Sequence, residues 1–348
     1  MTLQPIEGFQ ALKTHHCVTG SMRHIYEFHD YPISEDLLLG VGAGVGFVYW
    51  HMKGTTPFFG GRANAGRPGE KGLEKTVGRR TGVGVESFQT SSAKKAEKAV
   101  LDLLGAGEPV MIQLDMGFLS YFNFPKEYHF GGHVVVLAGY DPDTRQVLVA
   151  DRDGELHPVS LEVLARARGS EFKPFPPRNI WHAFDFSHKR PPTSKEVEQA
   201  IREVAKGMLK PPIANLGVKG IRTAAERALN WPRIMSEENL RHTCLNVFIF
   251  IDAKGGSGGG IFRYMYGRFL KEAAGITGND ALAKVGEDIC AIGDQWQRVA
   301  HVFEKGYSAT NPSTLLPEAS HLILNVADRE QAAWTQLHEI VASSCRTK

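Results

Sequence analysis

Two apolar runs joined by a turn sequence constrain the fold of this chain more than any other feature. Residues 133–140 and 147–151 are strand-like, and Asp141-Pro142-Asp143-Thr144 between them is typical of a tight turn. Strands connected this closely pair antiparallel. We therefore expect an antiparallel sheet in the first half of the chain.

The register of this strand pair depends on the length of the connection. If residues 141–145 connect the strands, His133 lies opposite Asp153 and diagonal to Asp151 on one face of the sheet. If the connection is one residue shorter, both carboxylates turn to the other face. The sequence permits both registers.

Cys17 begins a short amphipathic segment within residues 15–30. The apolar residues of this segment recur at helical spacing, at Val18, Met22, Ile25 and Tyr26. A thiol in the first turn of a helix feels the positive end of the helix dipole and unpaired backbone N–H groups. Both favour the thiolate, which is the nucleophilic form of cysteine.

Cys17, His133 and Asp151 provide the residue types of a cysteine nucleophile. Thiol acyl transfer needs a thiolate, an imidazole that holds and returns the proton, and a group that orients the imidazole. Asp153 is the rival of Asp151 for the orienting role. Each residue also has an ordinary structural interpretation, because an isolated cysteine is most often a small buried hydrophobe.

The length of the chain and a change in its composition predict an α+β protein of two domains. The chain has 348 residues, of which 42% are hydrophobic and 22% charged, as in ordinary globular proteins. A shift in composition at Lys189-Arg190-Pro191-Pro192 divides it into residues 1–190 and residues 191–348. The second domain opens with the capping box Thr193-Ser194-Lys195-Glu196 and is expected to be mainly helical. Its later helices are predicted at residues 220–229, 261–274, 282–303 and 328–343, with one strand at 246–251.

Charge, hydropathy and cysteine usage argue against several classes of protein. The net charge is +2 and no basic stripe with interleaved aromatic residues occurs, so nucleic-acid binding is not expected. No apolar run approaches the roughly 18 residues of a membrane helix, and no signal peptide is visible. A cytoplasmic protein without membrane attachment is expected. The cysteines are far apart and form no C-x-x-C pair, which argues against a zinc site or a disulfide scaffold. We expect no metal and no cofactor.

One motif points to a different nucleophile. Gly255-Gly256-Ser257-Gly258-Gly259 satisfies the G-x-S-x-G pattern of a serine nucleophile elbow. Partners for a serine triad would be Asp280 or Asp288 and His301 or His321. Five of the six residues 255–260 are glycine, and the alternation of strands and helices that such an elbow requires is missing. A flexible loop is the favoured interpretation.

Two further hypotheses concern binding. Asp115 and Tyr121 precede His133, and their residue types suit an amine-bearing, cationic acceptor. Residues 54–84, predicted as loop with at most one helix, carry a basic cluster that could dock an acidic carrier protein. A solvated loop is the simpler interpretation of that cluster. Its members are Arg62, Arg67, Lys71, Lys75, Arg79 and Arg80.

Dispersed motifs in both halves of the chain resemble one family. The first half contains His16-Cys17, Gly40-x-Gly42-x-Gly44-x-Gly46-Phe47-x-Tyr49, Leu114-Asp115-x-x-x-Leu119-x-Tyr121 and Phe130-Gly131-Gly132-His133-Val134-Val135-Val136-x-x-Gly139-Tyr140-Asp141. The second contains Asn215-Leu216-Gly217-Val218-Lys219-Gly220-Ile221 and Gly256-x-Gly258-Gly259-Gly260-x-Phe262-Arg263-x-x-Tyr266-x-x-Phe269-Leu270. Together they resemble the butirosin biosynthesis protein H family. Its N-terminal domain has a papain-like fold akin to peptidase C39 domains, and a helical domain of unknown function often follows.

The resemblance implies an activity and partners. The founding member is understood to move an acyl group from an acyl-carrier-protein thioester onto an amine of an aminoglycoside. By this resemblance Cys17 is the acylated nucleophile, His133 the general base and acid, and Asp151 the orienting residue. Papain-like enzymes commonly place a glutamine about six residues before the cysteine, where this chain has Ala11. The backbone N–H of Cys17 and the side chain of His16 are then the candidate oxyanion donors.

Three functions remain open from the sequence. The favoured one is a cysteine-dependent acyltransferase of antibiotic or other small-molecule biosynthesis, with a carrier-protein or coenzyme-A-type thioester as donor and an amine as acceptor. The second is a hydrolase of peptides or amides, in which water replaces the amine. The third is a non-catalytic binding protein that keeps the papain-like shell. A homodimer is compatible with each of them.

Overall fold

The computed structural model describes residues 3–52, 55–66, 72–123 and 128–343. They form two compact units, residues 1–38 with 66–191 and residues 39–65 with 192–348. The division at Pro191 lies next to the expected boundary, but residues 39–65 group with the second unit, unlike the continuous domain 1–190 that we expected. The reason is a hairpin of β1 (Val45–Trp50) and β2 (Phe58–Arg62). Its first strand bonds to the second unit through Tyr49 N and Asn215 O, 2.8 Å apart.

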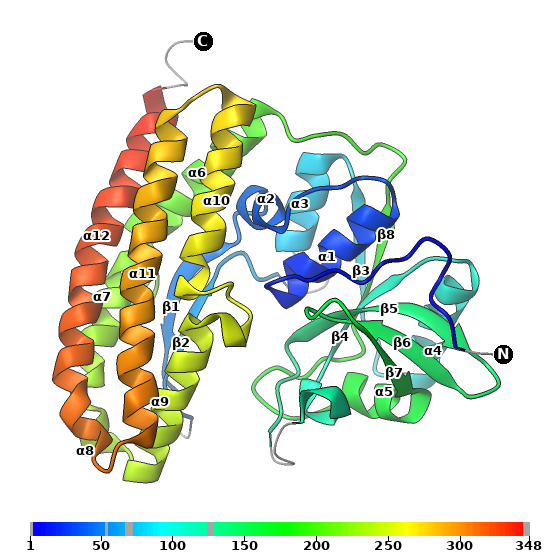
Figure 1. Cartoon of the computed structure of the whole chain (residues 1–348), viewed down its shortest axis with the longest axis horizontal. Coiled ribbons are helices and arrows are strands. Elements are labelled where there is room, and N and C mark those ends of the chain that lie inside the picture. The colour runs from blue at the N-terminus through cyan, green and yellow to red at the C-terminus, as the bar shows by residue number, and fades with distance from the viewer. Residues whose placement is uncertain (1–2, 53–54, 67–71, 124–127, 344–348) are drawn as a thin grey trace. The chain divides into compact units, whose positions relative to one another are not determined.

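A six-stranded antiparallel sheet forms the centre of the first unit (Figure 1). The spatial order of its strands is β3-β8-β4-β5-β6-β7. The strands are β3 (Gly84–Phe88), β4 (Val110–Leu114), β5 (His133–Asp141), β6 (Gln146–Ala150), β7 (Leu156–Ser160) and β8 (Trp181–Asp185). The apolar, β-branched sequences of β4, β5 and β6 account for their central place. The predicted α+β class with an N-terminal antiparallel sheet is confirmed.

The pairing of β5 with β6 combines the two registers that the sequence permits. Next to the turn, Asp141 pairs with Gln146, which corresponds to the shorter connection. The register shifts between Leu137 and Gly139, and beyond the shift Leu137 pairs with Val149, as in the longer one. Such an irregularity turns all later side chains of a strand to the opposite face. It therefore brings His133 diagonal to Asp151 on one face of the sheet.

Helices cover both sides of this sheet. They are α1 (Cys17–Phe28), α3 (Leu73–Thr81), α4 (Ala93–Gly105) and α5 (Leu161–Arg168), with α2 (Glu35–Val41) at the division between the units. Apolar residues of α4 and α5 share one buried core with Val135 and Leu137 of β5. Figure 1 shows α1 and α5 on opposite sides of the sheet. Since side chains alternate along a strand, His133 points to the same side as Val135 and Leu137.

Several short strands were not predicted from the sequence. Residues 54–84 are more ordered than a loop with one helix, because they contain β2, α3 and the start of β3. The strands β7 and β8 were not predicted either. The exposed Pro158 weakens the strand signal of β7, and its position is tolerated because β7 lies at the edge of the sheet.

The second unit consists mainly of helices, as predicted. They are α6 (Ser194–Leu209), α7 (Gly217–Ala228), α8 (Trp231–Ile234), α9 (Glu237–Ile251), α10 (Arg263–Thr277), α11 (Ala281–Ser308) and α12 (Leu316–Ser343). The predicted capping box is present, with Thr193 and Glu196 bonding to each other's backbone N–H. In Figure 1, α10, α11 and α12 run side by side. Among the described residues, no helix is both long enough and apolar enough to cross a bilayer.

The predicted strand at residues 246–251 is wrong, because these residues form the last turns of α9. Their sequence, Asn-Val-Phe-Ile-Phe-Ile, has strong β-propensity. The helix begins at Ser236, whose side chain accepts the N–H of Asn239. From there the buried residues follow helical spacing, at Leu240, Cys244, Val247, Phe248 and Ile251. Burial of this helical stripe overrides the local preference for a strand.

Candidate active site

His133 and Asp151 form a buried pair where two central strands meet. His133 begins β5 and Asp151 directly follows β6. Nε2 of His133 lies 2.7 Å from Oδ2 of Asp151, and the other carboxylate oxygen accepts the N–H of Arg152 at 2.8 Å. Burial lowers the pKa of His133, but the adjacent carboxylate outweighs it and raises this pKa to about 9. Burial alone would raise the pKa of Asp151, yet the His133 charge and hydrogen bond lower it below its ordinary value.

Cys17 is the first residue of α1 and is half-buried beside this pair. Burial raises the pKa of its thiol, but the charges and hydrogen bonds of His16 and His133 outweigh burial and hold the pKa well below its ordinary range. Because Asp151 occupies Nε2 of His133, Nδ1 is the ring nitrogen left to face the thiol. These contacts favour a thiolate on Cys17 and an imidazolium on His133.

Glu35 fixes the residues in front of Cys17. This buried carboxylate in the first turn of α2 accepts the N–H of His15 at 2.8 Å and of His16 at 2.7 Å. It also accepts the hydroxyl of Thr19 at 2.9 Å. Sequence reasoning missed Glu35, because an acidic residue in the first turn of a helix has an ordinary electrostatic explanation. Its contacts to α1 are invisible without the fold.

Backbone contacts join the segment before Cys17 to the segment after Asp151. The N–H of Thr14 donates to the carbonyl of Arg152 at 2.9 Å, and Lys13 forms an isolated antiparallel bridge with Asp153. These contacts bring residues 13–16 beside the end of β6. They explain how a helix near the N-terminus presents its thiol to a strand more than a hundred residues later.

His16 is the N-cap residue of α1 and is buried. Its Nδ1 lies 3.3 Å from the N–H of Thr19 and 3.1 Å from the Thr19 hydroxyl. The imidazole also interacts with the Cys17 sulfur. The predicted neighbour of the nucleophile therefore lies next to it, with one ring nitrogen committed to the start of the helix.

The structure distinguishes Asp151 from its rival. Asp153 bonds to Nε2 of His157 at 2.8 Å, and its side chain is 49% exposed. Asp151, in contrast, is 3% exposed and contacts His133 directly. Tyr121, predicted to face an amine acceptor, instead donates its hydroxyl to Oδ2 of Asp151 at 2.9 Å. The hydroxyl of Tyr121 is thus directed at the protein's own carboxylate.

Asp115 does not face a substrate, contrary to expectation. It is fully buried, and its Oδ1 accepts the N–H groups of Gly117 at 3.0 Å and Phe130 at 2.9 Å. Its Oδ2 accepts from Nδ1 of His129 at 2.9 Å and from the hydroxyl of Ser170 at 2.6 Å. Four donors saturate the carboxylate, so its role is to join three loop segments.

A cavity of about 780 Å³ opens beside this junction. Its lining includes Phe118, His129, Arg166 and Phe172, but not Cys17, His133 or Asp151. The size of a cavity is therefore a poor guide to the chemistry here, and the candidate active site rests on the geometry of its side chains.

The serine interpretation of the glycine-rich loop is wrong. Ser257 is 1% exposed, and its hydroxyl bonds to the carbonyls of Ile251 at 3.0 Å and Asp252 at 2.9 Å. The same oxygen accepts the N–H of Gly259 at 3.2 Å. The hydroxyl closes the turn after α9 and is not available as a nucleophile.

The described residues of the basic cluster are divided between the two units. Arg80 is buried, and Arg62 belongs to the second unit whereas Lys75 and Arg79 belong to the first. Arg67 and Lys71 lie outside the described residues. Arg80 is thus unsuited to a docking surface, and docking of a carrier protein by the other residues stays a prediction.

One cluster among the described residues has the composition of a metal site. Ligand atoms of Asp153, Glu155 and His157 lie within 4.8 Å of one another. Asp153 and Glu155 are exposed, and Asp153 already bonds to His157. Exposed acidic groups of this kind are common without an ion, so the cluster carries no metal assignment.

Comparison with known families gives two matches that together cover most of the chain. Residues 16–152 match the family described as Butirosin biosynthesis protein H, N-terminal. Residues 162–337, about half of the chain, match a Domain of unknown function (DUF4872). The chain belongs to the butirosin biosynthesis protein H family. A search of curated proteins finds no match to it.

Membership in the family confirms the resemblance and the papain-like-related fold that it implies. The first match begins one residue before Cys17 and ends one residue after Asp151, so it contains the whole candidate site. The second begins at residue 162, well before the boundary expected near residue 190. The family is associated with butirosin biosynthesis, which suggests an enzyme of an antibiotic pathway.

Proposed function

We propose that the protein is a cysteine-dependent acyltransferase that forms an acyl thioester on Cys17 and passes the acyl group to an amine. The observation that carries the proposal is the placement of the Cys17 thiol beside an imidazole whose far nitrogen lies 2.7 Å from a buried carboxylate. This arrangement has the nucleophile, the base and the orienting group of thiol acyl transfer. Membership in a family associated with antibiotic biosynthesis favours a small-molecule acceptor.

The first half-reaction loads the enzyme. The Cys17 thiolate attacks the carbonyl carbon of a thioester donor and forms a new C–S bond. The tetrahedral adduct then expels the donor's thiol, which takes its proton from the His133 imidazolium. The products are acyl-Cys17, the free thiol of the donor and a neutral His133.

The second half-reaction transfers the acyl group. A neutral amine attacks the carbonyl carbon of acyl-Cys17 and gives its proton to His133. The C–S bond breaks, an amide is released, and the Cys17 thiolate and His133 imidazolium are restored. Asp151 keeps the imidazole in place and stabilises its charged form throughout.

Both half-reactions place a negative charge on the carbonyl oxygen. The N–H of Cys17 lies in the first turn of α1, where backbone donors have no partner within the helix. Since Ala11 replaces the glutamine common in papain-like enzymes, His16 is the side chain next to Cys17 that could supply a second donor. We assign the oxyanion site to these two groups.

The test is to incubate the protein with an acyl-pantetheine thioester and to measure its intact mass. We expect one acyl adduct, absent from Cys17→Ala and retained in the matched variant Cys290→Ser. Absence of an adduct with every thioester donor would overturn the proposal. If an adduct forms but decays at the same rate with and without added primary amines, the enzyme is a hydrolase and the transferase assignment is wrong.

A further inference from the structure

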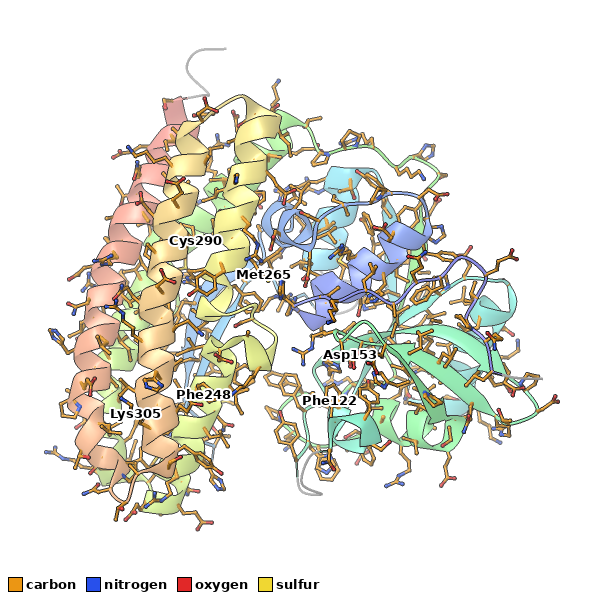
Figure 2. The ribbon with its side chains drawn as sticks, in the orientation of Figure 1. Phe122, Asp153, Phe248, Met265, Cys290 and Lys305 are labelled. Atoms are coloured by element: carbon orange, nitrogen blue, oxygen red, sulfur yellow. The ribbon has the colours of Figure 1, made fainter. Side chains whose placement is uncertain are left out.

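Two aspartate–histidine pairs have their carboxylates in the segment that follows β6, and the histidine of one of them, His133, contacts Cys17. The inner pair is Asp151 with His133, and the outer pair is Asp153 with His157. Figure 2 labels Asp153 of the outer pair and Phe122. The mechanism above uses the inner pair alone and gives no role to the outer pair.

Tyr121 connects the two pairs. Its hydroxyl donates to Oδ2 of Asp151 at 2.9 Å, the same oxygen that bonds to His133. Its ring stacks on the ring of His157, with centroids 3.9 Å apart and planes 14° apart. One tyrosine therefore contacts the catalytic carboxylate with one end and the outer pair with its face.

The inner carboxylate needs such support. Asp151 directly follows the last residue of β6, where the strand no longer fixes the direction of its side chain. Apart from His133, the hydrogen bonds to its oxygens come from the N–H of Arg152 and the hydroxyl of Tyr121. The Arg152 N–H belongs to the next residue of the same segment, so Tyr121 is the support that comes from another part of the chain.

The outer pair in turn restrains Tyr121. His157 lies on β7 opposite Val149 of β6, so its backbone position is fixed by the sheet. Its Nε2 bonds to Asp153 at 2.8 Å, which sets the orientation of the ring against which Tyr121 stacks. The adjacent Phe122 contacts the His133 ring edge-on, with centroids 5.5 Å apart. Residues 121 and 122 therefore hold both members of the catalytic pair.

We propose that Tyr121 is a positioning residue that holds Asp151 against His133, and that the His157–Asp153 pair holds Tyr121. The inference rests on the proposed role of the His133–Asp151 pair and deepens it. Within the described part of the chain, the other charged or titratable groups around His133 and Asp151 are Cys17, His16, His24 and Arg152. None of them is changed in the NMR titration below except Cys17, which is serine in every titrated sample.

The test is an NMR titration of the His133 imidazole in a Cys17→Ser background, which needs no acyl-transfer activity. The starting pKa is raised by contact with Asp151, to about 9 with Cys17 present. In Tyr121→Phe, which keeps the ring and loses the hydroxyl, we expect this pKa to fall by about one unit because the carboxylate is less firmly held. With Cys17 restored, the same substitution should move the pH midpoint of Cys17 alkylation upward by at most about one unit.

The outer pair is tested by two substitutions of one residue. His157→Ala removes the stacking partner and should lower the His133 pKa in the same direction by a smaller amount. His157→Phe keeps the stacked ring but loses the bond to Asp153, so it should lower this pKa by less than His157→Ala does. Tyr140→Phe, at the far end of β5, is the matched control and should change nothing.

The outcomes separate this inference from the proposed function. An unchanged or raised His133 pKa in Tyr121→Phe would overturn the positioning role, whatever the enzyme transfers. A shift in Tyr140→Phe as large as in Tyr121→Phe would overturn it as well. Failure of the acyl-adduct assay together with the expected shift would leave the positioning role standing and remove only the transferase.

Discussion

The two units each bury an ion pair, and the pairs differ in what surrounds them. In the helical unit, Arg263 and Glu330 are both fully buried. Glu330 accepts Nε and Nη2 of Arg263 at 2.7 and 3.0 Å, and the indole N–H groups of Trp296 and Trp334 at 2.8 and 2.5 Å. The remaining guanidinium nitrogen donates to the carbonyls of Gly46 and Ile261. Protein groups therefore satisfy this pair on every side.

The pair in the sheet unit has a reactive neighbour instead. His133 and Asp151 are almost as well buried, but the second nitrogen of His133 faces the half-buried thiol of Cys17. A saturated buried pair can only hold a structure together, whereas a pair in contact with a titratable nucleophile can exchange a proton with it. The neighbouring groups therefore distinguish a structural ion pair from a catalytic one, because both kinds of pair are buried.

The largest effect should come from His133→Gln, measured as the rate of acyl-adduct formation on Cys17. Loss of a general acid and base typically costs about 10²–10⁴-fold in rate, so we expect a decrease in that range. His129→Gln is the matched control, because His129 also bonds to a buried aspartate in the same unit. Equal losses in the two variants would contradict the catalytic assignment.

Arg263→Met should affect stability and leave the chemistry intact. Removing one partner of a buried ion pair leaves the other charge buried without compensation, which costs about 3–5 kcal/mol in free energy of unfolding. Glu330→Gln is the milder variant, should the first fail to fold. In whichever variant folds, denaturant unfolding should show a lower free energy of unfolding. The alkylation rate of Cys17 in the folded protein should match that of the wild type. A slower alkylation rate in folded protein would show that the saturated pair is not purely structural.

Glu35→Gln should lower both the stability of the fold and the reactivity of Cys17, each by less than the variants above. The carboxylate accepts two backbone N–H groups and a hydroxyl, and a buried donor left without its charged partner costs about 1–3 kcal/mol. We expect lower unfolding free energy and slower alkylation of Cys17. Glu27→Gln, an exposed position on α1, is the control. Wild-type alkylation in Glu35→Gln would mean that the position of Cys17 does not depend on Glu35.

Ser257→Ala should have the smallest effect. Its hydroxyl closes a turn with neutral hydrogen bonds, so the expected loss is about 1 kcal/mol of unfolding free energy. Acyl-adduct formation should be unchanged. Complete loss of adduct formation in this variant would revive the serine nucleophile.

Local sequence signals predicted the parts of the site that depend on residue type and period. The apolar strands around residues 133–151 predicted the antiparallel pair, and helical spacing after Cys17 predicted the helix. The register could not be predicted, because a single irregularity near Ala138 decides which face Asp151 occupies. One extra residue in a strand leaves no mark on the alternation of apolar residues when both faces are buried.

The contacts that distant residues make with the site could not be predicted from the sequence for a related reason. Glu35 and His157 contact the site or its neighbours from separate elements, and each has an ordinary local explanation in its own segment. Tyr121 was named from the sequence, but for an amine acceptor and not for its contact with Asp151. Asp115 shows the opposite error, since a polar residue after a strand predicted a binding role and the fold instead saturated it with four donors. At residues 246–251, tertiary burial of a helical stripe outweighed β-propensity.

The central claim is that His16 and the His133–Asp151 pair together keep Cys17 as a thiolate. The most direct measurement is an ultraviolet titration of the thiolate, as the difference between wild type and Cys17→Ser. The pKa of Cys17 lies well below its ordinary value and that of His133 is raised to about 9, so the thiolate signal should be present already in mildly acidic solution and persist through neutral pH. It should be lost only as the pH falls through the lowered pKa of Cys17. A signal that appears only around pH 8.5, where an unperturbed cysteine ionises, would contradict the account.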